Sequence, residues 1–288
     1  MNLNFDGVYQ DATIWLNNRE IGAHPYGYTG FNLDLTPFLK IGARNVLAVK
    51  VDTSGQHTRW YSGSGIYRHV SLSVTPALHI APWGVAITTP QVDAAAATVA
   101  VRAHLQNDGA VAANAMLRLS LRDRSGKIVA TQNTQSPLGA AASGEIAGSL
   151  RVSSPLLWSP SAPNLYSLRT EVLSGGKILD ALDTSFGIRS ISFDAKNGFL
   201  LNGRSVKMRG GCVHHDNGPL GSAAFDRAEE RRVALLKAAG FNAIRTSHNP
   251  PSTAFLAACD RLGMLVMDEA FDAWAHGKNP NDYNRFFK

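Results

Sequence analysis

The chain has 288 residues, of which 44% are hydrophobic and 17% charged, and its formal net charge at pH 7 is +6. This length and composition allow two or three globular domains, each with a core of its own. The Lys and Arg residues are scattered and are not interleaved with aromatic residues, so we expect no nucleic-acid partner. No run of about 18 apolar residues occurs, so we expect no membrane span.

The N-terminal third has the pattern of an antiparallel sheet. Residues 1–75 alternate apolar and polar positions in short runs such as "ATIWLN" and "NVLAVKVD". Turn residues, for example in "KIGARN", separate these runs. We therefore predict a β domain over this span.

The middle of the chain continues in the same style. Residues 76–190 contain alternating runs such as "TVAVRAHLQN" and "LYSLRTEVL". Turn residues separate them at the spacing expected of a seven-strand sandwich. We expect linkers at the two ends of this domain, in "TPALHIAP" and "SFGIRSISFD".

After about residue 190 the rhythm changes. "FLLNGRSVKMRGG" predicts a short hairpin that leads into an apolar strand. "AAFDRAEERRVALLKAAG" has helical periodicity and ends at Gly240, and "FNAIRT" reads as a buried strand.

A second helix and a third strand follow. "STAFLAACDRLG" predicts a helix with Ser252 or Thr253 as its N-cap and Gly263 at its end, and "MLVMDE" predicts a strand. Alternating strands and helices are typical of a parallel α/β barrel or a doubly wound sheet. No glycine-rich phosphate loop follows a strand, which disfavours the nucleotide-binding fold.

Polar clusters follow all three predicted strands of this segment, in "RGGCVHHD", "RTSH" and "DEAFD". The carboxyl ends of parallel strands meet at one face, and in barrels that face carries the chemistry. Two cysteines, Cys212 and Cys259, lie in apolar patterns that predict buried thiols rather than a disulfide.

These stretches resemble a known family of enzymes. "FNAIRTSHNPP" with "CDRLGMLVMDEAFD" is similar to the first signature of glycoside hydrolase family two, the β-galactosidase and β-glucuronidase family. "DGVYQDATIWLNNREIGAHPYGYTGFNLDLT" resembles the jelly-roll sugar-binding domain of that family, and "RWYSGSGIYRHVSL" resembles its closing strand. Together with "DEAFDAWAHGKNPNDYNRFF", the closing strand is most similar to the bacterial β-galactosidase branch.

The resemblance implies a multidomain β and α/β architecture. It assigns residues 1–75 to a partial jelly-roll β-sandwich and residues 76–190 to an immunoglobulin-like β-sandwich. Residues 191–288 would form the first strands and helices of a (β/α)8 TIM barrel.

The resemblance also supplies candidate site residues. His214, Arg245 and His248 match residues that line the family's sugar pocket, and Arg59 would reach that pocket from the jelly roll. Forked guanidinium donors and carboxylate acceptors suit sugar hydroxyls, and a Trp ring can stack on the apolar face of a sugar. The full set of candidate substrate-binding residues is His214, Arg245, His248, Asp268, Glu269, Asp272, Arg59, Trp60 and Trp274.

Each candidate also has a purely structural interpretation. Arg245 could pair with an acid of "DEAFD", His248 could cap a loop, and Arg59 could be a surface residue. The two Trp residues could be edge packing. The adjacent His214 and His215 suggest a metal, but they point apart and no third ligand has suitable spacing, so we expect no metal and no cofactor. The resemblance leaves a Mg²⁺ or Na⁺ site open in the full-length enzyme.

The catalytic pair of the family is missing from the sequence. Retaining glycosidases need two carboxyl groups about 5–5.5 Å apart. The family places both Glu residues on later barrel strands, with the acid/base in an Asn-Glu motif, and no Asn-Glu pair occurs here. About 100 residues follow position 190, whereas a whole barrel needs about 250. Asp268 and Glu269 cannot substitute, because neighbouring strand residues face opposite sides.

We therefore expect a fragment that lacks the first jelly-roll strands and most of the barrel. The full-length O-glycosyl hydrolase would hydrolyse terminal non-reducing β-D-galactose residues of an oligosaccharide or glycoconjugate with retention. The fragment would be inactive alone and prone to self-association through its unpaired sheet edge. The alternatives are β-glucuronidase or β-mannosidase specificity, or a non-catalytic carbohydrate-binding module. A periplasmic or secreted location would suit the full-length enzyme.

Overall fold

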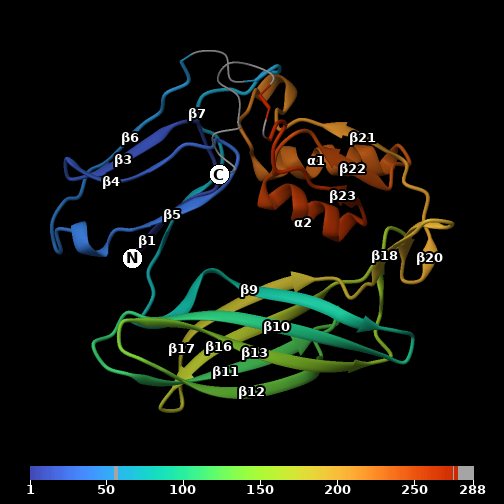
Figure 1. The fold of residues 1–288 in the computed structure, drawn as a ribbon, viewed down its shortest axis with the longest axis horizontal. Coiled ribbons are helices and arrows are strands. Elements are labelled where there is room, and N and C mark those ends of the chain that lie inside the picture. The colour runs from blue at the N-terminus through green and yellow to red at the C-terminus, as the bar shows by residue number, and fades with distance from the viewer. Residues whose placement is uncertain (55–57, 275, 278–288) are drawn as a thin grey trace. The chain divides into compact units, whose positions relative to one another are not determined.

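The computed structural model describes residues 1–54, 58–274 and 276–277. The chain splits into two compact units (Figure 1). One unit combines Met1–Val74 with Arg209–Lys288, and the other is Thr75–Met208.

The unit Thr75–Met208 is built around two antiparallel sheets. The three-stranded sheet has the order β13-β10-β9 and the four-stranded sheet the order β12-β11-β16-β17, which confirms the immunoglobulin-like sandwich. The seven strands are β9 (Leu78–Val92), β10 (Ala96–Asn107), β11 (Ala113–Arg122), β12 (Ile128–Leu138), β13 (Ala142–Ser153), β16 (Tyr166–Ser174) and β17 (Lys177–Phe186).

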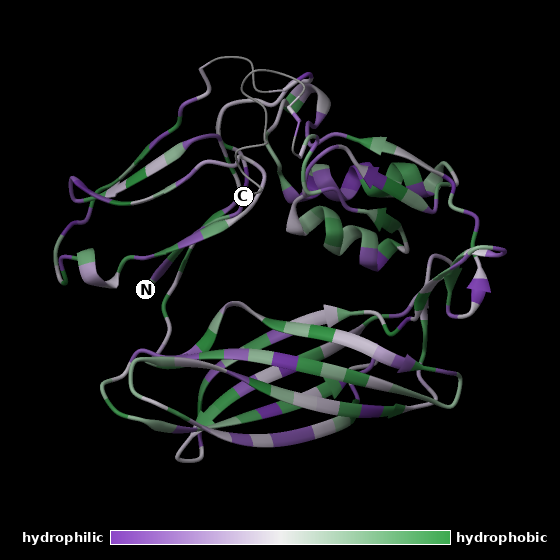
Figure 2. Ribbon diagram, viewed as in Figure 1, coloured by the Kyte–Doolittle hydropathy of each residue, from purple (hydrophilic) through white to green (hydrophobic). Residues whose placement is uncertain are grey.

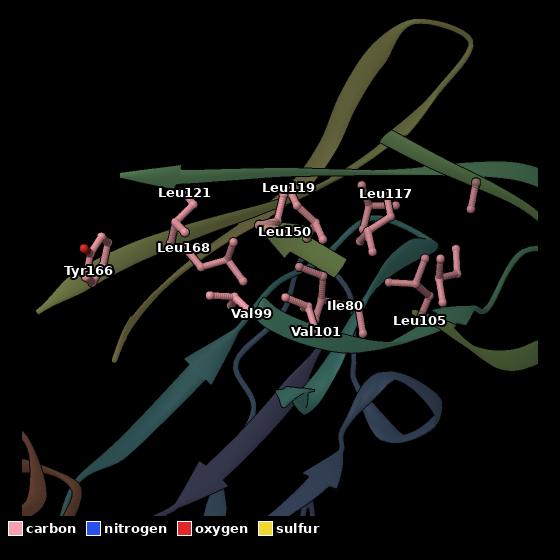
Figure 3. Packing of buried hydrophobic residues seen from close by; sticks show 14 of the residues in the cluster. Ile80, Val99, Val101, Leu105, Leu117, Leu119, Leu121, Leu150, Tyr166 and Leu168 are labelled. Carbon is pink, nitrogen blue, oxygen red and sulfur yellow. The ribbon is translucent and has the colours of Figure 1, made fainter. Parts of the chain in front are cut away.

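The core of the sandwich follows from the alternation of its strands. Figure 2 shows hydrophobic and hydrophilic residues alternating along them, so that one side chain in two faces inward. Figure 3 shows Val99 and Val101 from β10 facing Leu117, Leu119 and Leu121 from β11, all of them buried.

The predicted linker "TPALHIAP" is wrong, because β9 begins within it at Leu78. Leu78 and Ile80 are 4% and 7% exposed and belong to the sandwich core. The unit also contains short strands: β14 (Trp158–Ser159) pairs with β15 (Ala162–Pro163), and β18 (Ile191–Asp194), β19 (Gly198–Leu201) and β20 (Arg204–Ser205) form a three-stranded sheet.

The N-terminal part of the other unit is a partial jelly roll. One sheet has the order β5-β1-β8, a second has the order β4-β3-β6, and β2 pairs with β7. The strands are β1 (Asn2–Phe5), β2 (Val8–Tyr9), β3 (Ala12–Leu16), β4 (Arg19–His24), β5 (Phe31–Asp34), β6 (Leu47–Lys50), β7 (Gly65–Ile66) and β8 (Val70–Ser73), with a 3-10 turn η1 (Thr36–Phe38) after β5. Phe5, Ile14 and Phe31 are among the residues of its core.

The C-terminal part of this unit is the start of a TIM barrel. The parallel strands β21 (Gly210–Val213), β22 (Ala243–Thr246) and β23 (Leu265–Met267) lie in that order. Helix α1 (Asp226–Ala238) connects the first two strands and α2 (Thr253–Leu262) the last two, which confirms the predicted alternation.

Helix α2 begins and ends where local signals place it. The Ser252 side chain accepts a hydrogen bond from the backbone N–H of Phe255 at 3.1 Å, and Gly263 closes the helix with φ of 75°. Phe255 and Cys259 pack with Val233 of α1 in the core of this part. None of the helices in the described part of the chain is long and apolar enough to cross a membrane.

Candidate functional site

The polar residues at the strand ends come together as the parallel register requires. Cys212 of β21 is opposite Arg245 of β22, and Arg245 is opposite Met267 of β23. His214 lies two residues after Cys212, and Glu269 lies two residues after Met267, so both are at the carboxyl end of the sheet. The first turn of chain after each strand therefore supplies one member of a polar cluster.

Glu269 holds two of the candidates with its carboxylate. Its Oε1 accepts a hydrogen bond from Nε of Arg245, and its Oε2 lies 2.8 Å from Nδ1 of His248. Nη2 of Arg245 is also 3.5 Å from Nδ1 of His248. The hydrogen bond to Glu269 raises the pKa of Arg245 further above its usual value, so the guanidinium stays charged.

A second ion pair joins the jelly roll to the segment after β23. Nη2 of Arg59 donates to both carboxylate oxygens of Asp272, at 2.8 and 3.0 Å. The Asp272 side chain is only 4% exposed, whereas that of Arg59 is 47% exposed. Oδ1 of Asp272 also lies 3.9 Å from Nε2 of His248, so His248 lies between the two carboxylates.

Trp60 forms an aromatic wall beside the histidines. Its ring centroid is 5.1 Å from that of His214 and 5.3 Å from that of His248. The two imidazoles meet edge to face at 5.7 Å. The indole N–H of Trp60 donates to the hydroxyl of Tyr28 at 3.3 Å, which fixes the plane of the ring.

Asp268 and Trp274 belong to neighbouring groups. Oδ1 of Asp268 accepts a hydrogen bond from the Thr246 hydroxyl at 3.2 Å, and burial raises the pKa of its carboxyl group. Asp268 therefore joins the buried side of β22, while Glu269 joins the side of Arg245. Trp274 is 54% exposed and packs edge-on against Phe271, with ring centroids 5.0 Å apart.

His215 has a structural role that differs from that of its neighbour. Nε2 of His215 lies 2.9 Å from the carbonyl oxygen of Ser62, and its ring packs against Tyr28 and Tyr67. Burial lowers the pKa of His215 to about 4, so the imidazole is neutral at pH 7 and donates from Nε2. Among the residues that the structure describes, no group of three His, Cys, Asp or Glu could hold a metal ion.

The expectation of buried thiols is right for Cys259 and wrong for Cys212. Cys259 is buried, but Cys212 is exposed, and its sulfur lies 3.6 Å from Nη1 of Arg245. The neighbouring Ser247 side chain and Arg245 lower the pKa of the Cys212 thiol. Its apolar neighbours in sequence do not reveal this polar setting, which arises from the parallel pairing of β21 with β22.

Sequence reasoning missed Arg68, which supports the cluster from the jelly roll. Arg68 donates from Nη1 to the carbonyl oxygen of Tyr28 at 2.9 Å and from Nη2 to that of Pro250 at 2.8 Å. It therefore ties the jelly roll to the chain just beyond His248. The alternating tyrosines of "HPYGYTG" were the available signal, since Tyr26 and Tyr28 are buried in one aromatic group with Tyr67.

A small cavity lies beside His214 and His215. Its volume is about 20 Å³, and Arg68, His215, Arg232 and Asn249 contribute to its lining. A single water needs about 10–15 Å³ of such space, so the cavity is far too small for a sugar ring. Arg59 and Arg245 lie on the more exposed side of the cluster.

Three sequence profiles match successive parts of the chain. The sugar binding domain of glycosyl hydrolases family 2 matches residues 1–76, the profile described as glycosyl hydrolases family 2 matches residues 78–189, and the TIM barrel domain of that family matches residues 194–284.

Curated relatives agree with these profiles. Beta-galactosidase BoGH2A of Bacteroides ovatus is 44% identical over 99% of this chain and 34% of its own length. A putative beta-glucuronidase of Formosa agariphila is 38% identical over 98% of this chain and 26% of its own length. The chain thus spans between about a quarter and a third of the length of these two relatives.

Solved structures share the same fold. A glycosyl hydrolase family 2 member from Bacteroides cellulosilyticus superposes with a TM-score of 0.96 and 49% identity, covering 99% of this chain and 37% of that one. A beta-glycosidase from Bacteroides vulgatus superposes with a TM-score of 0.90 and 38% identity, covering 99% of this chain and 36% of that one.

Proposed function

Since the chain belongs to glycosyl hydrolase family 2, we propose that it supplies part of the sugar pocket of a β-galactosidase. The whole enzyme would remove terminal non-reducing β-D-galactose residues with retention of configuration. The observation that carries this proposal is the cluster of Arg245, His248 and Glu269 at the carboxyl ends of the barrel strands. Active sites of TIM-barrel enzymes lie at that face.

The chemistry of the cluster suits a hexose. Arg59 and Arg245 each keep N–H groups beyond those that bond the carboxylates, because a guanidinium has five. Glu269 and Asp272 can accept hydrogen bonds from sugar hydroxyls. Trp60 offers a flat apolar surface beside them, as expected where one face of a sugar ring carries only C–H groups.

We propose that this cluster binds the sugar and does not break the glycosidic bond. A general acid must hold a proton near neutral pH, which requires an environment that destabilises the carboxylate. Glu269 bonds Arg245 and His248, and Asp272 bonds Arg59, so each carboxylate contacts cationic or imidazole side chains and lacks the apolar setting that a general acid requires. The acid/base and the nucleophile would lie outside these 288 residues.

β-Glucuronidase activity is the second candidate. The observation that favours it is the 38% identity to the putative beta-glucuronidase of Formosa agariphila. The 44% identity to a beta-galactosidase favours the first candidate. A carbohydrate-binding module is disfavoured, since such a module has no need for the parallel strands β21 to β23 and their helices.

The proposal is tested by NMR titration of the 288-residue chain, labelled at histidine, with methyl β-D-galactoside. We expect the signals of His214 and His248 to shift at millimolar concentrations, and Arg245→Ala to weaken the binding about tenfold, the usual effect of one charge-assisted hydrogen bond. Arg169→Ala, which removes a guanidinium paired with Glu171 and Asp183 in the sandwich, is the matched control. Shifts that are absent, or that survive Arg245→Ala unchanged, contradict the proposal.

A further inference from the structure

We propose that Asp272 makes this pocket select neutral sugars, because its carboxylate occupies the guanidinium of Arg59. The inference rests on the proposed function for the statement that a sugar binds here. The exclusion of other carboxylates from Arg59 is a property of the chain itself and can be measured separately.

Asp272 and Arg59 differ in how far their side chains are exposed. Asp272 is 4% exposed and Arg59 is 47% exposed, and one nitrogen of Arg59 bonds both oxygens of the carboxylate. A buried carboxylate needs a partner that compensates for its lost hydration, and Arg59 is that partner. The exposed side of Arg59 remains open to a ligand, but its charge is already balanced.

The other guanidinium of the cluster is engaged in the same way. Arg245 bonds Glu269, which also contacts His248. Among the described residues, each guanidinium of the cluster thus has a carboxylate of its own. A neutral hexose loses nothing by this pairing, since its hydroxyls use the remaining N–H groups and the carboxylate oxygens. The carboxylate of a uronic acid would meet Asp272 and Glu269 as like charges.

Asp272 is the residue whose charge decides the selection. Removal of the Glu269 carboxylate would disturb Arg245 and His248 together, so its effect would not be specific. Removal of the Asp272 charge leaves Arg59, half-exposed, without its bidentate partner. Such a carboxylate rejects a competing ligand by repulsion rather than by improving the contacts of the preferred one.

The test compares Asp272→Asn with the unaltered 288-residue chain. Each is titrated with methyl β-D-galactoside and with methyl β-D-glucuronide, and the Nε–H signal of Arg59 reports binding by NMR. The amide keeps the size of the carboxylate but removes its charge. We expect the affinity for the glucuronide to rise about tenfold, the equivalent of one charge-assisted hydrogen bond, whereas the affinity for the galactoside should not rise.

Two further variants make the result specific. Asp183→Asn is the matched control, since Asp183 pairs with Arg169 at 2.7 Å in the sandwich, and it should not change glucuronide binding. Asp272→Ala is measured as well, in case the amide variant does not fold, and it should give the same gain. Asp272→Asn combined with Arg59→Ala should lose the gain.

The outcomes separate this inference from the proposed function. No gain in glucuronide affinity in either Asp272 variant overturns the inference, as does an unaltered chain that binds the glucuronide as well as the galactoside. Failure of the galactoside to bind any of the proteins counts against the proposed function. A glucuronide gain at Arg59 in the Asp272 variants would still support the inference in that case.

Discussion

Nδ1 of His248 lies 2.8 Å from Oε2 of Glu269, and this contact fixes the imidazole between two carboxylates. Nε2 on the other side of the ring faces Asp272 at 3.9 Å. The ring is thereby aligned along the line between Glu269 and Asp272, with Trp60 beside it. The orientation of His248 depends on both the barrel segment and the jelly roll.

The first prediction concerns Glu269. Glu269→Gln should weaken binding of methyl β-D-galactoside about tenfold, because the amide has no charge and only one acceptor oxygen, whereas the carboxylate uses one oxygen for Arg245 and the other for His248. Titration by NMR measures the change. Glu230→Gln, which breaks an exposed pair with Arg261 on the helices, is the control and should leave binding unaltered. Equal binding by both variants would show that Glu269 does not organise the site.

The second prediction concerns the dependence of stability on pH. The folded pKa of His215 is lowered to about 4 by burial, so the unfolded chain binds more protons between its ordinary value near 6.5 and about 4. Stability from this group is complete above pH 6.5 and is lost as the pH falls toward 4, by about 3 kcal/mol. His215→Phe should remove that part of the acid sensitivity.

Urea unfolding at pH 7 and pH 4.5 measures this effect. His215→Phe should show a smaller loss of unfolding free energy between the two pH values than the unaltered chain. His104→Asn is the control, because the His104 side chain is 59% exposed. If all three proteins lose the same free energy, the burial of His215 is not the source of acid sensitivity.

The third prediction concerns the sandwich, which we expect to be an independent domain over about residues 76–190. Its strands pair with one another, and Trp158 is fully buried in this unit. Limited proteolysis of the chain should leave a resistant product near those limits. Rapid loss of this span during digestion, before the rest of the chain is cut, would contradict the prediction.

Local signals are enough to predict the elements whose ends are marked in the sequence. Ser252 and Gly263 bound α2 as expected, since a hydroxyl cap and a left-handed glycine act through their immediate neighbours. The start of β9 was missed, because Leu78 and Ile80 lie between prolines that suggest a linker. Only the burial of both residues in the sandwich core, a tertiary effect, makes that stretch a strand.

In the candidate site, too, local patterns predict some features, and others depend on tertiary packing. Strand periodicity predicts that His214, Arg245 and Glu269 meet at one face, because a parallel sheet brings its carboxyl ends together. The pairing of Arg59 with Asp272 joins positions 213 residues apart, and no local pattern indicates it. It depends on how the jelly roll packs within the unit. The exposure of Cys212 is missed for the same reason.

The fourth prediction concerns self-association. In the described part of the chain, β21 and β23 are the outer strands of the three-stranded parallel sheet, and Met267 of β23 is 57% exposed. Unpaired strand edges and exposed apolar side chains promote association. Light scattering should therefore show mass increasing with concentration, and Met267→Lys should reduce the increase.

Ile178→Lys serves as the control for this prediction. Ile178 is 50% exposed on β17 of the sandwich, so the substitution adds the same charge away from the parallel sheet. It should leave association unchanged. A stable monomer at high concentration, without any substitution, would show that this sheet edge does not mediate contacts between molecules.

The most direct test of the account is the hydrolysis of a chromogenic β-galactoside by the purified 288-residue chain. Arg245→Ala and His248→Ala are assayed beside it. We expect no turnover above background in any of the three, because these residues bind a sugar and the chain contains no Asn-Glu pair to supply the acid/base. Turnover that is well above background and falls in both variants would contradict the account, and would assign a catalytic role to Glu269 or Asp272.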